Sequence, residues 1–497
     1  MRNDIAARAR EIALTLTAWP SVTGSPGEVD FAPRLAAYLA HFDSVWREPI
    51  PGDARSNVFE RKRGRWRNTV VLTGHYDVVP VSDYGEFEPL AFAPEPLSAA
   101  AIARLRRSGE NPLALADLES GVFLPGRGLL DMKAGLAAGI AAIEAYTGEA
   151  NLLFVAVADE EERSAGARAA APLLAGIARE HGLDIRLVIN LDAISDQGDG
   201  ALGRVVALGS VGKLLLTALV VGKEAHACYP QDGANAAYLG AELLSEFELA
   251  PDLAEISGAE IAAPPTALHA KDLKSGYNVT TPAQSWLYWN TLQHRRPAQE
   301  VLDIALMLAR RAMARAGHRL NRDIPVMSHA ELAARIAPAD RLRIAMDVAR
   351  RPLSDLPEQS KQVTTGMWKA SGLSGPAVVL GFGSIPYPAV TLTDAGLEDA
   401  VLRAAAAQGV GALRYFPGIS DMSFLGQATG DLSVAAANTP IWGTGFVMLE
   451  PAGYPCINIG PWGRDYHHWL ERLHAPYAFE TLPRVLLAVI DAVTESR

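Results

Sequence analysis

Cysteine is nearly absent from the sequence: Cys228 and Cys456 are the only two among 497 residues. Two cysteines cannot form the disulfide framework that stabilises many small secreted domains. We therefore expect a chain that folds in a reducing compartment, and cytoplasmic localisation is a prediction of the sequence.

Long apolar runs are also missing. No uncharged stretch approaches the roughly 20 residues that a membrane-spanning helix requires. Near the N-terminus, Arg8, Arg10 and Glu11 interrupt the apolar residues, which is unlike the apolar core of a signal peptide. These features predict a soluble protein without a membrane partner.

Positive charge is scarce, and lysine is scarcer still. The chain has 45 Lys and Arg residues against 56 Asp and Glu residues, a net charge of −11, and only 8 of the basic residues are lysine. A nucleic-acid-binding surface needs clustered basic side chains, so no nucleic-acid partner is expected. The hydrophobic share of 49% and the charged share of 20% indicate a globular chain rather than a disordered one.

Short apolar runs alternate with longer helical patterns along the chain. The apolar runs lie at residues 69–73, 152–158, 187–191, 377–380 and 456–459, and the helical patterns at 135–146, 165–181 and 482–494. Runs of this length, rich in β-branched residues, are typical of buried parallel strands. Their alternation with helices predicts an α/β fold.

One part of the chain has its own pattern. Residues 210–322 read as strand, helix, strand and helix, which predicts a small α+β domain inserted into the larger one. The larger domain would then comprise residues 1–209 and 323–497. The proline-rich segment 81–125 is interpreted as an extended surface excursion with an Arg-rich helical piece, and residues 361–375 as a loop.

The first candidate site residues follow the apolar run 69–73. His75 and Asp77 are two residues apart, so in extended backbone both side chains point to the same side. Histidine is a common metal ligand, and a nearby aspartate can fix its tautomer. The alternative is a histidine and an aspartate in an ordinary turn.

Acidic residues end the next two apolar runs. Glu160 and Glu161 belong to four consecutive acidic residues after the run 152–158, and Asp192 follows the run 187–191. Bound cations would relieve the repulsion within such a cluster, whereas a solvated acidic loop is the alternative. One carboxylate could bind a metal while another acts as a general base. The carboxyl ends of parallel strands meet at one edge of a sheet, so these residues should converge with His75.

Two further stretches could complete the site. Asp131 stands in the stretch GRGLLDMKAG at the start of a helical pattern, where it could cap the helix or bridge two metals. The C-terminal region holds His467, His468 and His474, and spacing alone does not select a ligand among them.

Together these motifs resemble the M20 family of metallohydrolases, of the aminoacylase-1 and carboxypeptidase G2 type. The resemblance rests on H-x-D at His75, G-R-G-x-x-D-M-K-x-G at Gly126 and D-E-E-x-x-S-x-G at Asp159, in this order. The stretches F-P-G-I-S-D-M-S at Phe416 and G-P-W-G-R-D-Y-H at Gly460 look closest to the arginine-utilisation branch. The resemblance implies a zinc-exopeptidase-like catalytic domain, with a mixed, mainly parallel sheet and helices on both faces, and a ferredoxin-like α+β lid.

The resemblance also implies a role for each site residue. Glu160 would act as the general base and Asp77 would orient His75. The implied ligands of two Zn²⁺ ions, with Co²⁺ or Mn²⁺ as alternatives, are His75, Asp131 as the bridge, Glu161, Asp192 and His474, with His467 as the alternative to His474. The implied reaction is cleavage of an amide bond in an N-acyl amino acid or a short peptide by a metal-bridging water.

The inserted segment contributes two more implied residues. His226 would stabilise the oxyanion and Asn278 would contact the substrate, although His226 alone reads more simply as a surface histidine of the lid. Gly418 and Ser420 resemble the family's glycine-rich substrate loop. The lid would also make a homodimer. A second hypothesis is a non-catalytic binding or regulatory protein on the same scaffold.

Overall fold

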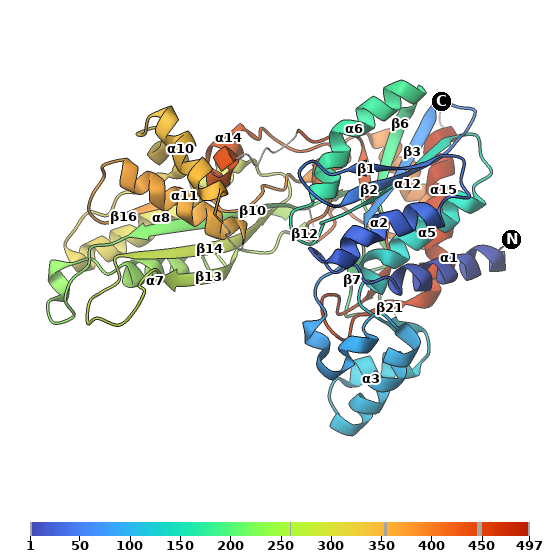
Figure 1. Ribbon diagram of the computed structural model, residues 1–497, viewed down its shortest axis with the longest axis horizontal. Helices are drawn as coiled ribbons and strands as arrows, with labels where there is room; N and C mark the ends of the chain where they lie inside the picture. Colours follow the sequence, from blue (N-terminus) through green and yellow to red (C-terminus); the bar gives the residue numbers. More distant parts are fainter. Residues whose placement is uncertain (1, 259, 352–354, 445–449, 496–497) are drawn as a thin grey trace. The chain divides into compact units, whose positions relative to one another are not determined.

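The computed structural model describes residues 2–258, 260–351, 355–444 and 450–495. The chain divides into two compact units (Figure 1). Unit 1 comprises Met1–Ser210, Val390–Ala428 and Leu449–Arg497, and unit 2 comprises Val211–Ala389 and Thr429–Met448. The candidate metal-binding residues from the sequence all belong to unit 1.

Unit 1 is built on an eight-stranded mixed sheet with the strand order β1-β2-β5-β3-β6-β19-β8-β18. The four central strands β5, β3, β6 and β19 run parallel to one another. The pairs β1–β2, β2–β5 and β19–β8 are antiparallel. The strands are β1 Val45–Pro49, β2 Ser56–Lys62, β3 Asn68–His75, β5 Asn151–Val157, β6 Asp184–Asn190, β8 Val205–Ala207, β18 Gly411–Leu413 and β19 Cys456–Asn458. The predicted mixed, mainly parallel sheet is confirmed.

Helices cover both faces of this sheet. Successive residues of its strands point to opposite sides, so strands that are apolar throughout have apolar side chains on both faces. In β5, Leu152 and Phe154 pack on one face, while Leu153 and Val155 pack on the other. The first face carries α1 Arg2–Thr17, α2 Pro26–Tyr38, α5 Ala134–Ala145, α12 Ala395–Ala407 and α15 Leu482–Glu495; the second carries α6 Ala165–His181 and α13 Met422–Leu425. The predicted helices over both faces are therefore confirmed.

A smaller, four-stranded sheet lies next to the candidate site. Its strands run in the order β4 Phe123–Pro125, β21 Arg472–His474, β20 Trp462–Arg464 and β7 Ile194–Ser195. Before β4, residues 82–119 form η1 Ser82–Leu90, α3 Pro94–Ser108 and α4 Pro112–Glu119. We call residues 82–119 the helical excursion; its helices α3 and α4 contact β4, and α3 is labelled at the bottom of Figure 1. The sequence predicted an extended surface excursion with an Arg-rich helical piece; α3 contains that piece, with Arg104, Arg106 and Arg107, and the segment as a whole is mainly helical.

Unit 2 contains a five-stranded sheet with helices on both faces. The strands run in the order β13 Thr266–Asp272, β14 Gln284–Gln293, β10 Gly212–Val221, β16 Ala377–Phe382 and β15 Val326–Ser328. One face packs against α7 Ala236–Phe247 and α8 Ala298–Leu320, and the other against α9 His329–Ala333, α10 Pro338–Ala349 and α11 Leu356–Ala370. This is the α+β character that the sequence predicted for the insertion.

The predicted second boundary at residue 323 is wrong. Strand β16 pairs with β10, with Leu219 opposite Val379, so the chain returns to unit 1 only at Val390. The predicted loop at 361–375 is also wrong, because most of it lies in α11. Asp355 caps this helix by accepting a hydrogen bond from the Glu358 amide at 2.7 Å.

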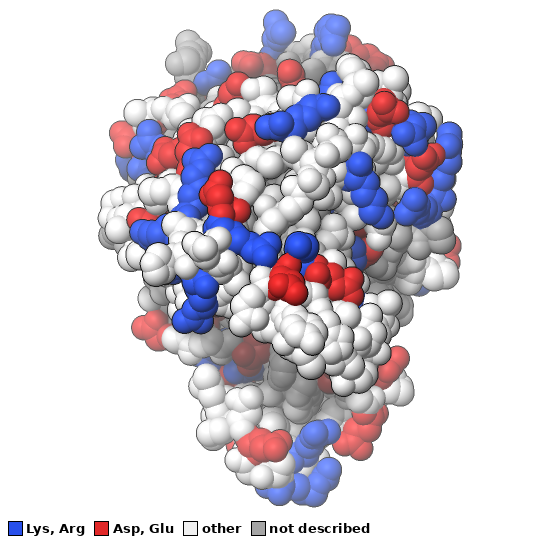
Figure 2. Space-filling model, turned by 90° about the vertical axis from the view of Figure 1, so that its left-hand side faces the viewer, with Lys and Arg blue, Asp and Glu red and all other residues white. Residues whose placement is uncertain are grey.

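Two observations bear on partners. Within the described ranges, no helix combines the length and the apolar character that crossing a membrane would need. Figure 2 shows one face of the molecule, on which Lys and Arg side chains are interspersed with Asp and Glu side chains rather than gathered into a basic patch.

Candidate active site

His75 is the last residue of β3, and its imidazole points at carboxylates from three other segments. Its Nε2 lies 3.2 Å from Asp131 Oδ1, 3.8 Å from Asp192 Oδ1 and 3.9 Å from Glu160 Oε2. Asp192 follows β6 and Glu160 follows β5, the two strands that flank β3. The predicted convergence at one sheet edge is therefore present.

Asp131 also faces a second imidazole. Its Oδ2 lies 3.1 Å from His467 Nε2, which is in turn 3.2 Å from Glu161 Oε2. Asp131 thus stands between two groups of donors, one with His75 and Asp192 and the other with His467 and Glu161. Donor atoms of His75, Asp131 and Glu161 lie within 4.8 Å of one another.

Asp77 holds both His75 and the acidic turn in place. Its backbone carbonyl lies 3.0 Å from His75 Nδ1. Its carboxylate accepts hydrogen bonds from the backbone amides of Glu160 at 3.1 Å and Glu161 at 3.3 Å, and from the Thr23 hydroxyl at 2.9 Å. Asp77 thus contacts the His75 imidazole through its backbone carbonyl, and its carboxylate fixes the backbone that carries Glu160 and Glu161.

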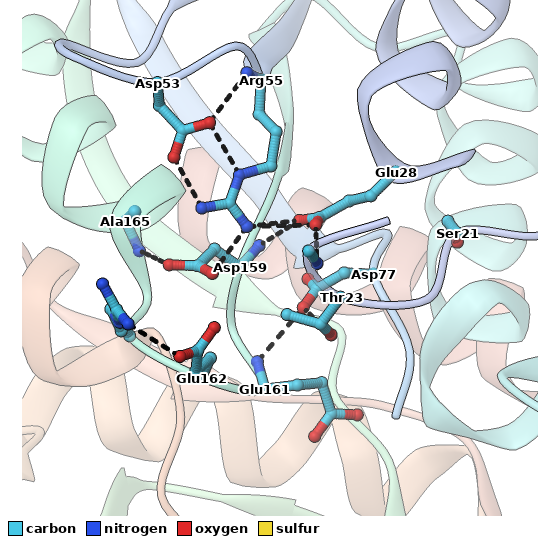
Figure 3. A network of polar contacts seen from close by, with 12 residues as sticks. Ser21, Thr23, Glu28, Asp53, Arg55, Asp77, Asp159, Glu161, Glu162 and Ala165 are labelled. Carbon is cyan, nitrogen blue, oxygen red and sulfur yellow. Dashed lines mark hydrogen bonds and ion pairs between the residues drawn. The ribbon is translucent and has the colours of Figure 1, made fainter. Parts of the chain in front are cut away.

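A buried ion-pair network supports the same turn from its other side (Figure 3). The Arg55 guanidinium contacts Asp159 at 2.6 Å and Glu28 at 3.0 Å. Glu28 in turn accepts a hydrogen bond from the Asp159 amide at 3.0 Å. Asp159 has a φ of 68°, a left-handed backbone conformation that is uncommon for residues other than glycine. This network holds Asp159 in the turn that directs Glu160 and Glu161 inward.

The loop that carries Asp131 is held by a carboxylate that the sequence did not assign. Glu471 is fully buried and accepts hydrogen bonds from the amides of Gly128 at 2.9 Å and Leu130 at 3.3 Å. Its other oxygen pairs with Arg127 at 2.8 Å. Burial raises the pKa of Glu471 to about 8, although Arg127 lowers it. In the sequence, Glu471 is visible only as an acidic residue four positions after His467, and this spacing alone does not indicate its role.

The carboxylates and imidazoles shift one another's pKa values. Burial raises the pKa of Glu160 and Asp192, and neighbouring carboxylates raise it further. Burial lowers the pKa of His467, but Asp131 and Glu161 outweigh it and raise that pKa to about 10. Buried negative charge thus favours cationic partners at this site.

The chain is similar to known proteins in sequence and in fold. The model of peptidase family M20/M25/M40 matches residues 71–437. The chain belongs to this family. The resemblance inferred from the motifs is confirmed, and membership supports hydrolysis of an amide bond as the general activity.

Two Bacillus subtilis (strain 168) proteins are relatives of this M20 chain, and each matches it over nearly its whole length. The uncharacterized protein YqjN is 32% identical, with 96% of this chain and 95% of YqjN covered. Protein RocB is 28% identical, with 97% and 94% covered, in agreement with the branch that the motifs resemble. The structure of Bacillus subtilis YxeP, described as a dinuclear metal-binding peptidase from the M20 family, covers 100% of both chains with a TM-score of 0.53 at 13% identity. That likeness shows the shared fold alone.

The donor set of this M20 chain fits divalent cations. Imidazole nitrogens and carboxylate oxygens are ligands that Zn²⁺ accepts readily, and Co²⁺ or Mn²⁺ also suit them. Asp131 Oδ1 is buried and, although His75 Nε2 lies 3.2 Å away, it accepts no well-aligned hydrogen bond from the described residues, as expected of a ligand atom. The residues that could hold divalent cations here are His75, Asp131, Asp192, Glu161 and His467.

The structure corrects the prediction that His474 is the last metal ligand. Its ring packs against those of Trp462, at 4.6 Å between centroids, and Phe123, at 5.1 Å. Its Nδ1 accepts a hydrogen bond from the Tyr477 amide at 3.2 Å. The structure therefore places the alternative, His467, beside Asp131 and Glu161, and gives His474 a packing position.

The four remaining predicted residues fall into two groups. His226 and Asn278 lie in unit 2 on adjacent segments, where the Ala227 amide donates to the Val279 carbonyl at 2.8 Å; both side chains are exposed. Gly418 and Ser420 lie in unit 1, where the buried Ser420 hydroxyl accepts a hydrogen bond from the Met422 amide at 3.3 Å. Their substrate contacts stay predictions.

Proposed function

We propose that this chain is a di-zinc hydrolase that cleaves the amide bond of an N-acyl amino acid or a short peptide. The observation that carries the proposal is the position of Asp131, whose two oxygens face His75 and His467 at 3.2 and 3.1 Å. Each imidazole has a further carboxylate nearby, Asp192 for one and Glu161 for the other. These side chains form a symmetric donor set that would suit two cations.

Glu160 is the residue proposed to move the proton. When bound, the cations would lower the pKa of a water molecule and polarise the scissile carbonyl. Glu160 accepts a proton from this water and returns it to the leaving amine. Asp77 keeps Glu160 in position by accepting a hydrogen bond from its amide, and it orients His75.

His226 is the residue proposed to stabilise the oxyanion that develops on the carbonyl. The Nδ1 of His226 accepts a hydrogen bond from the Cys228 amide at 3.2 Å. An accepting Nδ1 leaves the proton of a neutral imidazole on Nε2, where it can be donated to an oxygen. Asn278, Gly418 and Ser420 complete the proposal as substrate contacts.

The purified chain is expected to contain about two zinc ions and to hydrolyse at least one member of a panel of N-acyl amino acids, arginine derivatives among them, and dipeptides. Metal analysis and a chelator-controlled screen measure both. Chelation should abolish turnover, and Zn²⁺, Co²⁺ or Mn²⁺ should restore it. A folded protein with almost no metal and no chelator-sensitive turnover would instead support the non-catalytic hypothesis.

A homodimer through unit 2 is also part of the proposal. Strand β13 is an edge strand of its sheet, and Leu268 in this strand has 59% of its surface exposed. Light scattering should give twice the 53.0 kDa of one chain, and Leu268→Lys should shift the mass toward one chain. The control is Leu342→Lys, another exposed leucine of unit 2, in α10, which should leave the mass unchanged. A wild-type mass of one chain would contradict the dimer.

A further inference from the structure

The helical excursion, residues 82–119, supplies none of the candidate metal ligands but is in contact with the loop that carries one of them. That loop runs from β20 to β21 and holds Asp465, His467 and Glu471. Asp465 and His467 have φ values of 53° and 63°. Non-glycine residues adopt such values only where their surroundings determine the conformation. Something must therefore hold this loop in shape.

The polar part of that support is Asp117 on α4. Asp117 is 8% exposed, and its carboxylate accepts hydrogen bonds from Arg464 Nη1 at 2.5 and 2.7 Å and from Arg472 Nε at 2.8 Å. These two arginines are the residues at which the loop leaves β20 and enters β21. Arg472 Nη1 also contacts Asp465 at 2.5 Å inside the loop. One carboxylate of the helical excursion thus joins both ends of the loop.

The apolar part of the support comes from residues just after His467. The Trp469 ring lies 5.8 Å from the Phe87 ring of η1. Leu470 is buried in a cluster with Leu105 of α3 and Leu118 of α4. These contacts fix the second half of the loop against the helical excursion.

The two imidazoles of the site differ in how they are held. His75 ends a central strand of the sheet and its side chain is 2% exposed, whereas the His467 side chain is 45% exposed and stands on this loop. A change in the helical excursion should therefore displace His467 and leave His75 in place.

We propose that the helical excursion sets the metal affinity of the position formed by Asp131, Glu161 and His467, with Asp117 as its positioning residue. This inference rests on the proposed two-metal function. Partners that orient a metal ligand from outside the coordination sphere typically contribute about 10–100-fold to metal affinity. Asp117 orients a whole loop, so its removal should affect one of the two positions by this factor.

The test is a Co²⁺ titration of the metal-free full-length chain, followed by absorption spectroscopy. In Asp117→Asn, one of the two Co²⁺ equivalents should bind at least about 10-fold more weakly and with an altered visible spectrum, while the other keeps its affinity and spectrum. Glu119→Gln is the matched control, since Glu119 lies on the same helix and pairs with Arg106 at the surface. It should titrate like the wild type.

Two results would overturn the inference: both equivalents unchanged in Asp117→Asn, or both weakened alike. If Asp117→Asn does not fold, Asp465→Asn removes the contact that Arg472 makes inside the loop, and it should weaken the same single equivalent. If both Co²⁺ equivalents keep their wild-type affinity in that variant, the inference is also overturned. Fewer than two Co²⁺ equivalents in the wild type and in Glu119→Gln would instead refute the proposed two-metal function itself.

Discussion

Glu160→Gln is expected to lower kcat by about 10²–10⁴-fold while both metal ions stay bound. Glutamine has nearly the same size as glutamate but cannot take a proton from water at neutral pH. Burial and the neighbouring carboxylates raise the pKa of Glu160, which suits a group that accepts a proton and then returns it. The measurement is kcat on any substrate found in the screen, together with the zinc content of the same preparation.

The matched control for this variant is Glu162→Gln. Glu162 belongs to the same run of acidic residues, but its side chain is half exposed and pairs with Arg163. Its replacement should leave kcat within about twofold, since exposed ion pairs contribute little. Full activity in Glu160→Gln would exclude Glu160 as the base, and loss of one zinc ion would make Glu160 a ligand instead.

The positions of His75, Glu160 and Asp192 could be predicted because each follows a short apolar run. Such runs become the central parallel strands, and parallel strands deliver their next residues to the same sheet edge. The run at 377–380 is likewise short and apolar, yet it forms β16 in unit 2. A buried strand looks alike in either sheet, so local sequence could not place the boundary between the units.

The missed helix α11 shows a different limit. Pro357 at its first turn and the cap Asp355 are start signals that the sequence does contain. Thr364, Thr365 and Gly366 weaken helix propensity in its middle. The buried side chains of Val363 and Met367, one helical turn apart, pack on the unit 2 sheet and outweigh that weakness. Such tertiary packing is not visible in the local sequence.

The last of the proposed metal ligands could not be chosen from the sequence for a related reason. His467 reaches Asp131 only because its loop turns at two residues with positive φ, Asp465 and His467 itself. No periodic pattern encodes such a turn. His474, the ligand that the family resemblance implied, stands in β21, and its side chain packs beside Trp462.

These two histidines give the second large expected effect. His467→Ala should bind one metal ion instead of two and lose most of its turnover. Its Nε2 faces both Asp131 and Glu161, and its removal leaves two carboxylates without the nitrogen donor between them. Loss of an outer partner already costs about 10–100-fold in metal affinity, so loss of a direct ligand should exceed that. Metal content after dialysis and kcat at saturating zinc measure the two losses separately.

His474→Ala is the comparison that decides between the two histidines. It removes aromatic contacts with Phe123 and Trp462, so it should lower the melting temperature, at a cost of about 1–3 kcal/mol. Because His474 faces these rings rather than the carboxylates, the variant should keep two metal ions and its kcat. The reverse outcome, two ions in His467→Ala and one in His474→Ala, would restore His474 as the ligand. Loss of an ion in both variants would mean that metal binding depends on the fold of β20 and β21 as a whole rather than on one histidine.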